Sequence, residues 1–245
     1  MMSANEIPEK LAKSSPALKA RLAGLAYLIC GTAYTFADGS VRGKLVVAGD
    51  AAATARNILG HQSLYRLGFA ADLVSVLGYI AVTLLLYDLF RPVNRSLSLY
   101  AAFFSFGGCI IQAVSTLLHL APLVILGGAQ YWNAFQPEQL QSLALFSLDL
   151  RAQSTNIYMV FFGVYCILIG YLILRSTFMP RIIGAFLAIA GVGYLTFLSP
   201  PLAHDLFPHV LMPAGALGEG SLILWLLIFG VNSQRWKQQV AAAAE

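Results

Sequence analysis

The stretch VLMPAGALGEGSLILWLLIFGV, residues 210–231, contains a single charged residue, Glu219, at its centre. A helix that crosses the hydrocarbon core of a membrane takes about 20 residues, so this stretch has the length and composition of a membrane span. Similar runs precede it at roughly 21–40, 66–90, 97–127, 146–174 and 181–199. The sequence therefore predicts an all-α integral membrane bundle of six transmembrane helices.

The bulk composition agrees with a membrane protein. Of the 245 residues, 58% are hydrophobic and 11% are charged, whereas soluble domains average about 25% charged residues. The mean hydropathy is +0.73. Little chain remains for a separate soluble domain, so we expect a polar cytoplasmic N-terminal segment over 1–18, a six-span membrane domain over 19–232 and a cytoplasmic tail over 233–245.

Basic residues are distributed unevenly between the two sides of the predicted bundle. Ten lie on the side of the termini and the short turns, and five lie on the other side, namely Arg42, Lys44, Arg56, Arg66 and Arg151. The positive-inside rule then places both termini in the cytoplasm, with the chain in the inner (plasma) membrane. The net charge of +4 reflects this bias. The expected partner is the lipid bilayer and not nucleic acid, and the sequence leaves the oligomeric state open.

The predicted connections differ in length on the two sides. The cytoplasmic turns, 91–95 and 176–180, are short, and the outer connections, about 41–65, 128–145 and 200–209, are longer. In the first outer connection Asp50 is a natural N-cap for an alanine-rich segment, which predicts a short amphipathic helix on the outer face. The prolines of the last outer connection predict a turn. A site in the bundle would therefore open outward.

Polar residues recur at helical spacing within four of the predicted spans, which places them on one face of each helix. The stripes consist of Asp72, Ser75, Tyr79 and Thr83; Gln112, Ser115, Thr116 and His119; Asp149, Gln153 and Asn156; and Met212, Gly215 and Glu219. Arg151 lies on the far side of its helix from the third stripe. Because lipid cannot satisfy polar groups, we expect the stripes to meet inside the bundle. The small residues around Glu219 would let another backbone come close.

The ionisable residues within the spans indicate a candidate site, because each costs roughly 2.5–3.5 kcal/mol at bilayer depth and needs a partner, a wet cavity or a function. We expect an outward-facing polar pocket that binds a lipid or a small amphipathic ligand, with an arginine meeting any anionic group. Its expected lining is Asp72, His119, Arg151, Asn156, Glu219 and Arg66. The competing interpretation is a structural hydrogen-bond network, with Arg151 as a snorkelling surface residue. The catalytic residues are unknown, and an enzyme is the less favoured class.

Two other classes of function stay open. His119, His204 and His209, with Asp72 or Glu219 as base, would suit a zinc-dependent intramembrane hydrolase. A buried Glu219 would suit a small proton- or cation-coupled transporter, although the sequence has no convincing inverted repeat. A bis-histidine haem needs two histidines that face each other, and only His119 lies well within a span. The leading interpretation therefore requires no metal and no other cofactor.

Seven stretches of the sequence together indicate a resemblance to a known family. They are ARLAGLAYL (20–28), VRGKLVVAGDAAATA (41–55), LYRLGFAADL (64–73), FRPVNR (90–95), LDL (148–150), GYLILR (170–175) and PRIIG (180–184). In combination they resemble a family of bacterial multi-pass membrane proteins catalogued as domain of unknown function 4386. The resemblance covers about residues 18–232 and implies a membrane protein of six or seven spans, with no assigned activity.

The resemblance also bears on the candidate site. In the family a histidine often follows the position of Leu150 and another often precedes that of Cys166, whereas this chain has Arg151 and Tyr165 there. A metal site built from those positions would not carry over to this chain. The resembling stretches also hold charged residues that we expect on the outer half, in the same site or in the packing above it: Arg42, Asp50, Arg66, Asp72 and Asp149.

Overall fold

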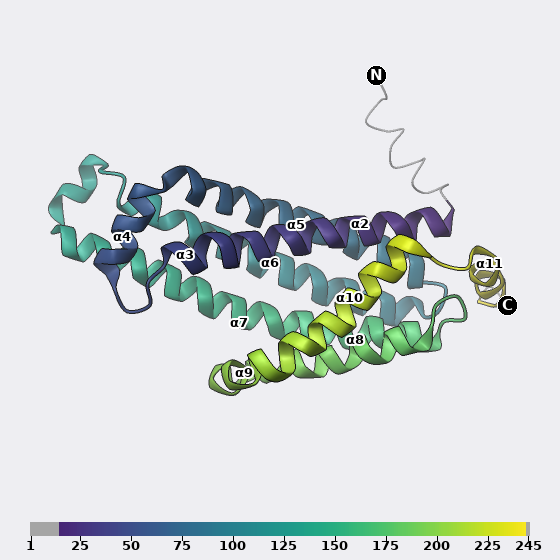
Figure 1. Cartoon of the computed structure of the whole chain (residues 1–245). Coiled ribbons are helices and arrows are strands. Elements are labelled where there is room, and N and C mark those ends of the chain that lie inside the picture. Colours follow the sequence, from purple (N-terminus) through teal and green to yellow (C-terminus); the bar gives the residue numbers. More distant parts are fainter. Residues whose placement is uncertain (1–14, 244–245) are drawn as a thin grey trace, which may run out of the picture. The chain divides into compact units, whose positions relative to one another are not determined.

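The computed structural model describes residues 15–243, which fold into helices joined by short connections, with no β-strand among them (Figure 1). The predicted all-α class is thus confirmed. Five helical stretches are long and apolar enough to cross a membrane, judged by length and composition: Gln62–Phe90, Arg95–Ile125, Pro137–Arg175, Arg181–Leu198 and Pro200–Ile228. The predicted span 21–40 is helical but is not one of these five.

The first predicted span and the connection that follows it form the N-terminal helices. α2 (Pro16–Thr35) continues without a break into a π-helical segment, Phe36–Arg42, and then into α3 (Gly43–Leu45). α4 (Ala51–Gly60) begins after Asp50, whose carboxylate accepts a hydrogen bond of 2.8 Å from the backbone N–H of Ala53. The predicted N-cap is confirmed, since this bond satisfies a first-turn donor. The position of α4 on the outer face stays a prediction.

Three long helices follow: α5 (Gln62–Phe90), α6 (Arg95–Ile125) and α7 (Pro137–Arg175). The turn between α5 and α6 is as short as predicted, and so is the turn from α7 to α8 (Arg181–Tyr194). α7 begins at Pro137 and not near 146, because proline suits the first turn of a helix and the polar residues after it continue the helix. At 39 residues, α7 is about 58 Å long.

The C-terminal part contains the helix of the predicted last span, α10, and shorter helices that the sequence did not predict. A 3₁₀ turn, Leu195–Leu198, leads to α9 (Pro200–Leu206), a π-helical segment (Phe207–Leu211), α10 (Met212–Ile228) and α11 (Ser233–Ala242). The prediction of a proline-rich turn over 200–209 is wrong, because its prolines lie in the first turns of helical segments, where no backbone donor is needed. The predicted tail 233–245 is mostly helical, and Asn232 caps α11 by accepting from the N–H of Arg235 at 3.0 Å.

The helices form two compact units. Unit 1 contains the described parts of Met1–Leu28, Ile80–Phe106 and Met159–Glu245, and unit 2 contains Ile29–Tyr79 and Gly107–Tyr158. Residues 1–14 of the predicted N-terminal segment lie outside the described residues, and the predicted division at 19 and 232 stays a prediction.

Within unit 1, two pairs of glycines bring α7 and α8 together. A Cβ atom at Gly170 would lie 2.7 Å from the carbonyl oxygen of Gly184, and one at Gly163 would lie 2.8 Å from that of Gly191. The reverse distances, from Cβ atoms at Gly184 and Gly191, are both 2.6 Å. Because backbone atoms occupy the space of a side chain at all four positions, only glycine allows this approach. The two contacts are seven residues apart on each helix.

α10 packs on α8 in the same unit (Figure 1). A Cβ atom at Gly218 would lie 2.9 Å from the carbonyl oxygen of Phe186 and 3.2 Å from the Cα atom of Leu187. The prediction that small residues near Glu219 admit a neighbouring backbone is therefore confirmed.

Candidate functional site

A group of charged side chains lies buried in unit 2. Asp72 comes from α5, His119 from α6, Arg151 from α7, and Arg42 from the end of the π-helical segment. Their exposed fractions are 0% for Asp72 and His119, 5% for Arg151 and 7% for Arg42. Asp38, from the same segment as Arg42, has a side chain that is 54% exposed. We call these five residues the charge cluster.

Helical spacing explains how α5 and α6 contribute to the cluster. The predicted polar stripes of these helices are buried along their whole length: Asp72, Ser75, Tyr79 and Thr83 on α5, and Gln112, Ser115, Thr116 and His119 on α6. Residues three or four apart share a face, so burial of one member draws the others inward. Both stripes are confirmed.

Arg42 joins the two carboxylates of the cluster. Its Nη1 donates to Asp72 Oδ2 at 2.8 Å, and its Nε and Nη2 donate to Asp38 Oδ1 at 3.1 and 2.9 Å. Hydrogen bonds between ionised partners are roughly twice as strong as neutral ones. The arginine therefore holds the π-helical segment against α5.

His119 lies between two acceptors. Its Nδ1 is 2.8 Å from Asp72 Oδ2, and its Nε2 is 3.3 Å from the backbone oxygen of Tyr65. The phenol of Tyr65 donates in return to the backbone oxygen of His119 at 2.7 Å. A Cβ atom at Gly68 would lie 3.2 Å from His119 Cε1, so glycine leaves room for the ring. The ring can donate from either nitrogen, and the Nη1 of Arg42, 3.0 Å from Nδ1, limits access to that nitrogen.

Arg151 is the least satisfied member of the cluster. Its Nη1 lies 3.8 Å from Asp38 Oδ1, and its Nη2 lies 3.7 Å from Asp72 Oδ1. Both distances are too long for a hydrogen bond. Among residues 15–243, its buried Nε and Nη2 have no hydrogen-bond partner, and neither has Asp72 Oδ1. The Nε–H and Nη2–H groups lie on the same edge of the guanidinium plane, which is the edge that binds two oxygens of one carboxylate or phosphate.

The charges of the cluster balance only at its exposed edge. Two buried arginines and one buried aspartate sum to +1 when His119 is neutral, and half-exposed Asp38 supplies the remaining negative charge. Water screens an exposed carboxylate more than a buried one. The buried part of the cluster is therefore electropositive, and Asp38 is its exposed member.

The predicted site residues do not all belong to this cluster. Asp72, His119 and Arg151 come together, whereas Arg66 is exposed on α5. Asn156 is half-buried and donates to exposed Gln153 at 3.1 Å.

The expectation for α7 was reversed by the structure. Its predicted inward stripe is wrong, because Asp149 and Gln153 are exposed and Arg151 is the buried residue. The alternative of a snorkelling Arg151 is wrong for the same reason.

Glu219 belongs to unit 1 and has its own partners there. The phenol of Tyr27 donates to one carboxylate oxygen at 2.9 Å, and that of Tyr194 donates to the other at 2.5 Å. Each oxygen of the acid therefore has a hydrogen-bond donor, which offsets the loss of hydration. This geometry is that of a structural link between α2, α8 and α10.

The described residues do not form a zinc site. Across residues 15–243, no three side chains of histidine, cysteine, aspartate or glutamate gather as metal ligands. His204 and His209 are exposed in unit 1, whereas His119 is buried in unit 2 with Asp72. The zinc and haem alternatives therefore gain no support from the geometry.

Sequence reasoning missed Asp38 and Tyr65, and it named Arg42 among the charged residues of the site or of the packing above it without predicting its contacts. Arg42 was counted as a basic residue of an outer loop, but the first helix continues through it. The available signal was the spacing of four residues between Asp38 and Arg42, which favours an ion pair on a helical turn. Tyr65 acts through its backbone oxygen as well as its phenol, which no sequence pattern predicts.

Comparison with known proteins gives a family without an assigned activity. A family model described as "Domain of unknown function (DUF4386)" matches residues 22–230. A protein of Archaeoglobus fulgidus named "Uncharacterized protein" is 26% identical over 153 residues, which is 62% of this chain and 76% of that relative. No solved structure matches the chain.

Proposed function

The chain belongs to the DUF4386 family, and from its charge cluster we propose a multi-pass membrane protein that binds a carboxylate or phosphate group at Arg151. The observation that carries this proposal is the buried guanidinium edge of Arg151, which lacks a hydrogen-bond partner among the described residues. An unsatisfied buried donor costs about 1–3 kcal/mol and more when charged. An oxyanion with two oxygens would satisfy both N–H groups at once.

The charge and surroundings of the cluster support an anionic ligand with an apolar part. A bound anion would balance the +1 of the buried groups Arg42, Asp72 and Arg151 in place of half-exposed Asp38. The helices of unit 2 also carry exposed apolar side chains, including Leu73 at 41% and Leu117 at 64%. Such surfaces suit the chain of an amphiphile whose head group reaches the arginine. The hydrolase and transporter alternatives have no comparable observation in their favour.

The proposed membrane arrangement has six spans, with both termini in the cytoplasm of a bacterial inner membrane. α2, the π-helical segment and α3 follow one another without a break and would together form the first span. The charge asymmetry supports this orientation more strongly than the sequence alone, because Arg42 and Arg151 are buried in the cluster. They no longer count among the basic residues of the outer connections.

This topology predicts the result of reporter fusions. Alkaline phosphatase fused after Gln136 is expected to be active, because the α6–α7 connection would lie outside. Fusions after Asn94 or after Ala243 are expected to be inactive, since both sites would lie in the cytoplasm. A green fluorescent protein fused at the same sites should give the opposite pattern. An active phosphatase after Asn94 would reverse the orientation.

Anion binding predicts opposite effects for two substitutions in the cluster. We expect octyl phosphate to stabilise the full-length protein in dodecyl maltoside against heat, because a ligand that binds only the native state raises its stability. Arg151→Gln should weaken this binding at least tenfold, since it removes hydrogen bonds to a charged group. Asp38→Asn should strengthen it, because a competing carboxylate is lost. Isothermal titration calorimetry measures both.

The matched control is Arg66→Gln, which removes the same charge from an exposed position of unit 2. Its affinity for octyl phosphate should remain within about twofold of the wild-type value, as for surface charges screened by salt. Titration with inorganic phosphate and with octanoate separates a free ion from an amphiphile and a phosphate from a carboxylate. The proposal fails if none of the three ligands binds, or if Arg151→Gln binds them as tightly as the wild type does.

A further inference from the structure

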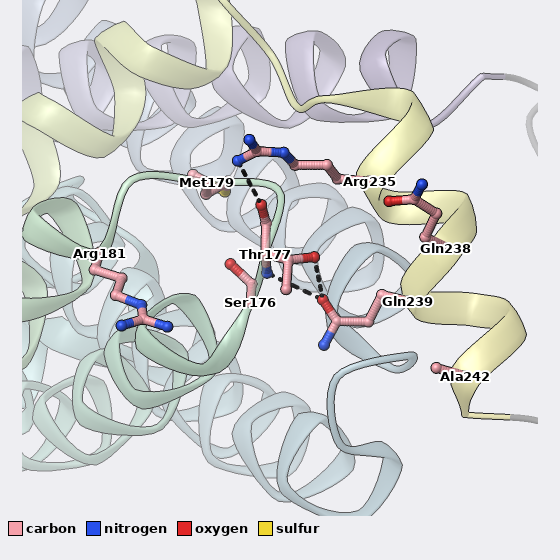
Figure 2. Close-up of a pocket in the computed structure, with 8 residues that line it drawn as sticks. All are labelled: Ser176, Thr177, Met179, Arg181, Arg235, Gln238, Gln239 and Ala242. Atoms are coloured by element: carbon pink, nitrogen blue, oxygen red, sulfur yellow. Dashed lines mark hydrogen bonds between the residues drawn. The ribbon is translucent and has the colours of Figure 1, made fainter.

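A polar pocket lies in unit 1, and none of the residues that line it belongs to the charge cluster. It has a volume of about 710 Å³ and lies between α11 and the turn that joins α7 to α8 (Figure 2). Volumes of about 300–1,000 Å³ are typical of small-molecule sites. The polar residues that line it are Ser176, Thr177, Arg181, Arg235, Gln238 and Gln239.

Hydrogen bonds fix α11 over this turn. Gln239 Oε1 accepts from the backbone N–H of Thr177 at 3.1 Å and from its hydroxyl at 3.0 Å. Arg235 Nη1 reaches the backbone oxygen of Thr177 at 3.4 Å, and the indole N–H of Trp236 donates to the backbone oxygen of Leu89 at 2.9 Å. The wall of the pocket is therefore held in place, and the amide NH₂ of Gln239 remains as a donor because its oxygen is used by Thr177.

Two arginines without an acidic partner face this pocket. Figure 2 shows the side chain of Arg235 extending from α11 to the 176–177 segment, and that of Arg181 at the start of α8. Within the described part of the chain, neither forms an ion pair with an aspartate or glutamate. Guanidinium groups and an amide donor around one pocket are the chemistry that binds a phosphate.

The position of the pocket favours a lipid over a soluble ion. It lies at the end of α7 and at the start of α8, where the helical stretches Pro137–Arg175 and Arg181–Leu198, both long and apolar enough to cross a membrane, meet in sequence. A turn between two such helices lies at a membrane surface, where phospholipid head groups are found. Ile182, next to Arg181, is 61% exposed and gives an apolar surface beside the pocket.

We propose that this pocket binds the phosphate of an anionic phospholipid, with Arg181, Arg235 and the amide of Gln239 as its ligands. The proposal rests on the membrane embedding proposed above and is independent of the anion site at Arg151. α11 then acts as an interfacial clamp, which holds a lipid head group against the end of the α7–α8 pair.

The test is native mass spectrometry of the full-length protein in detergent, titrated with phosphatidylglycerol and with phosphatidylcholine as the neutral comparison. The wild type should retain one phosphatidylglycerol molecule, with at least tenfold preference over phosphatidylcholine. The double variant Arg181→Gln/Arg235→Gln should bind phosphatidylglycerol about 25-fold more weakly, because each basic residue near an anionic head group contributes about 1 kcal/mol to binding. Gln239→Glu keeps acceptor oxygens for Thr177 but places a negative charge in the pocket, and should also weaken binding several-fold.

The control is Lys237→Gln/Arg95→Gln, which removes the same charge from unit 1 outside the pocket. Its affinity should stay within about twofold of the wild-type value. Equal losses in the two double variants would overturn the proposal, because general charge attraction would then explain the binding. Equal retention of the two lipids would also overturn it, and so would inorganic phosphate that binds as tightly as phosphatidylglycerol. These outcomes leave the Arg151 site unaffected, since its test uses a different variant and ligand.

Discussion

Replacing Asp72 by asparagine is expected to lower the free energy of unfolding by about 3–5 kcal/mol, the usual cost of removing one partner of a buried ion pair. Asp72 is fully buried, and its carboxylate accepts from Arg42 at 2.8 Å and lies 2.8 Å from His119 Nδ1. Asparagine has nearly the same shape, so the loss reflects charge and not a cavity. Unfolding in mixed micelles with increasing dodecyl sulfate, followed by circular dichroism, measures the change.

Asp149→Asn is the matched control, because Asp149 is exposed on α7 in the same unit. Its effect should stay within about 0.5 kcal/mol. The double variant Asp72→Asn/Arg151→Gln should recover part of the loss of Asp72→Asn, since the uncompensated positive charge is also removed. A loss below about 1 kcal/mol for Asp72→Asn would mean that the ion pairs do not stabilise unit 2.

Replacing Gly170 by alanine is expected to lower the free energy of unfolding by about 2–3 kcal/mol, near the upper end of the usual cost of overpacking. The added Cβ atom would lie 2.7 Å from the carbonyl oxygen of Gly184 and 2.8 Å from the backbone nitrogen of Ala188. Both obstacles are backbone atoms, so no rotamer change can relieve the contact. The helices α7 and α8 must separate, which also loosens the contact between Gly163 and Gly191.

The control for this substitution is Gly220→Ala on α10, where a Cβ atom meets nothing within 4 Å. Alanine there should be neutral or stabilise the protein by up to about 1 kcal/mol, because it is the better helix former. The same unfolding measurement in mixed micelles compares the two variants. Equal effects of the two substitutions would contradict a close glycine contact between α7 and α8.

The pattern of apolar runs predicted most of the fold because helix period and length act within one stretch of chain. It located the long helices to within a few residues, except at the start of α7, and it predicted the cap at Asp50. It failed where polar residues continue a helix, as at 137–145 and in α11. It also failed at Pro200 and Pro208, since the pattern predicts a break and the first turn of a helix tolerates proline.

The candidate site could be predicted only in part, because its geometry depends on pairing between distant segments. The polar stripes predicted that Asp72 and His119 are buried, but they did not predict that the two side chains are in contact. The predicted inward face of α7 was wrong. Counting polar residues favoured the face of Asp149, whereas the structure buries Arg151, which lies near the carboxylate of Asp72. The contacts of Arg42 could not be predicted without knowing that the first helix continues as a π-helical segment.

The order of the charge cluster along the chain has a consequence for biosynthesis. A charged residue costs about 2.5–3.5 kcal/mol at bilayer depth when it enters alone. Arg42 is synthesised before Asp72, so the acid of α5 meets its counter-ion as soon as its own helix emerges. Arg151 comes last and finds Asp38 and Asp72 already in place. In the proposed membrane arrangement, each ionised side chain of the cluster after Asp38 therefore has a partner that is synthesised before it, which for Arg42 is Asp38 itself.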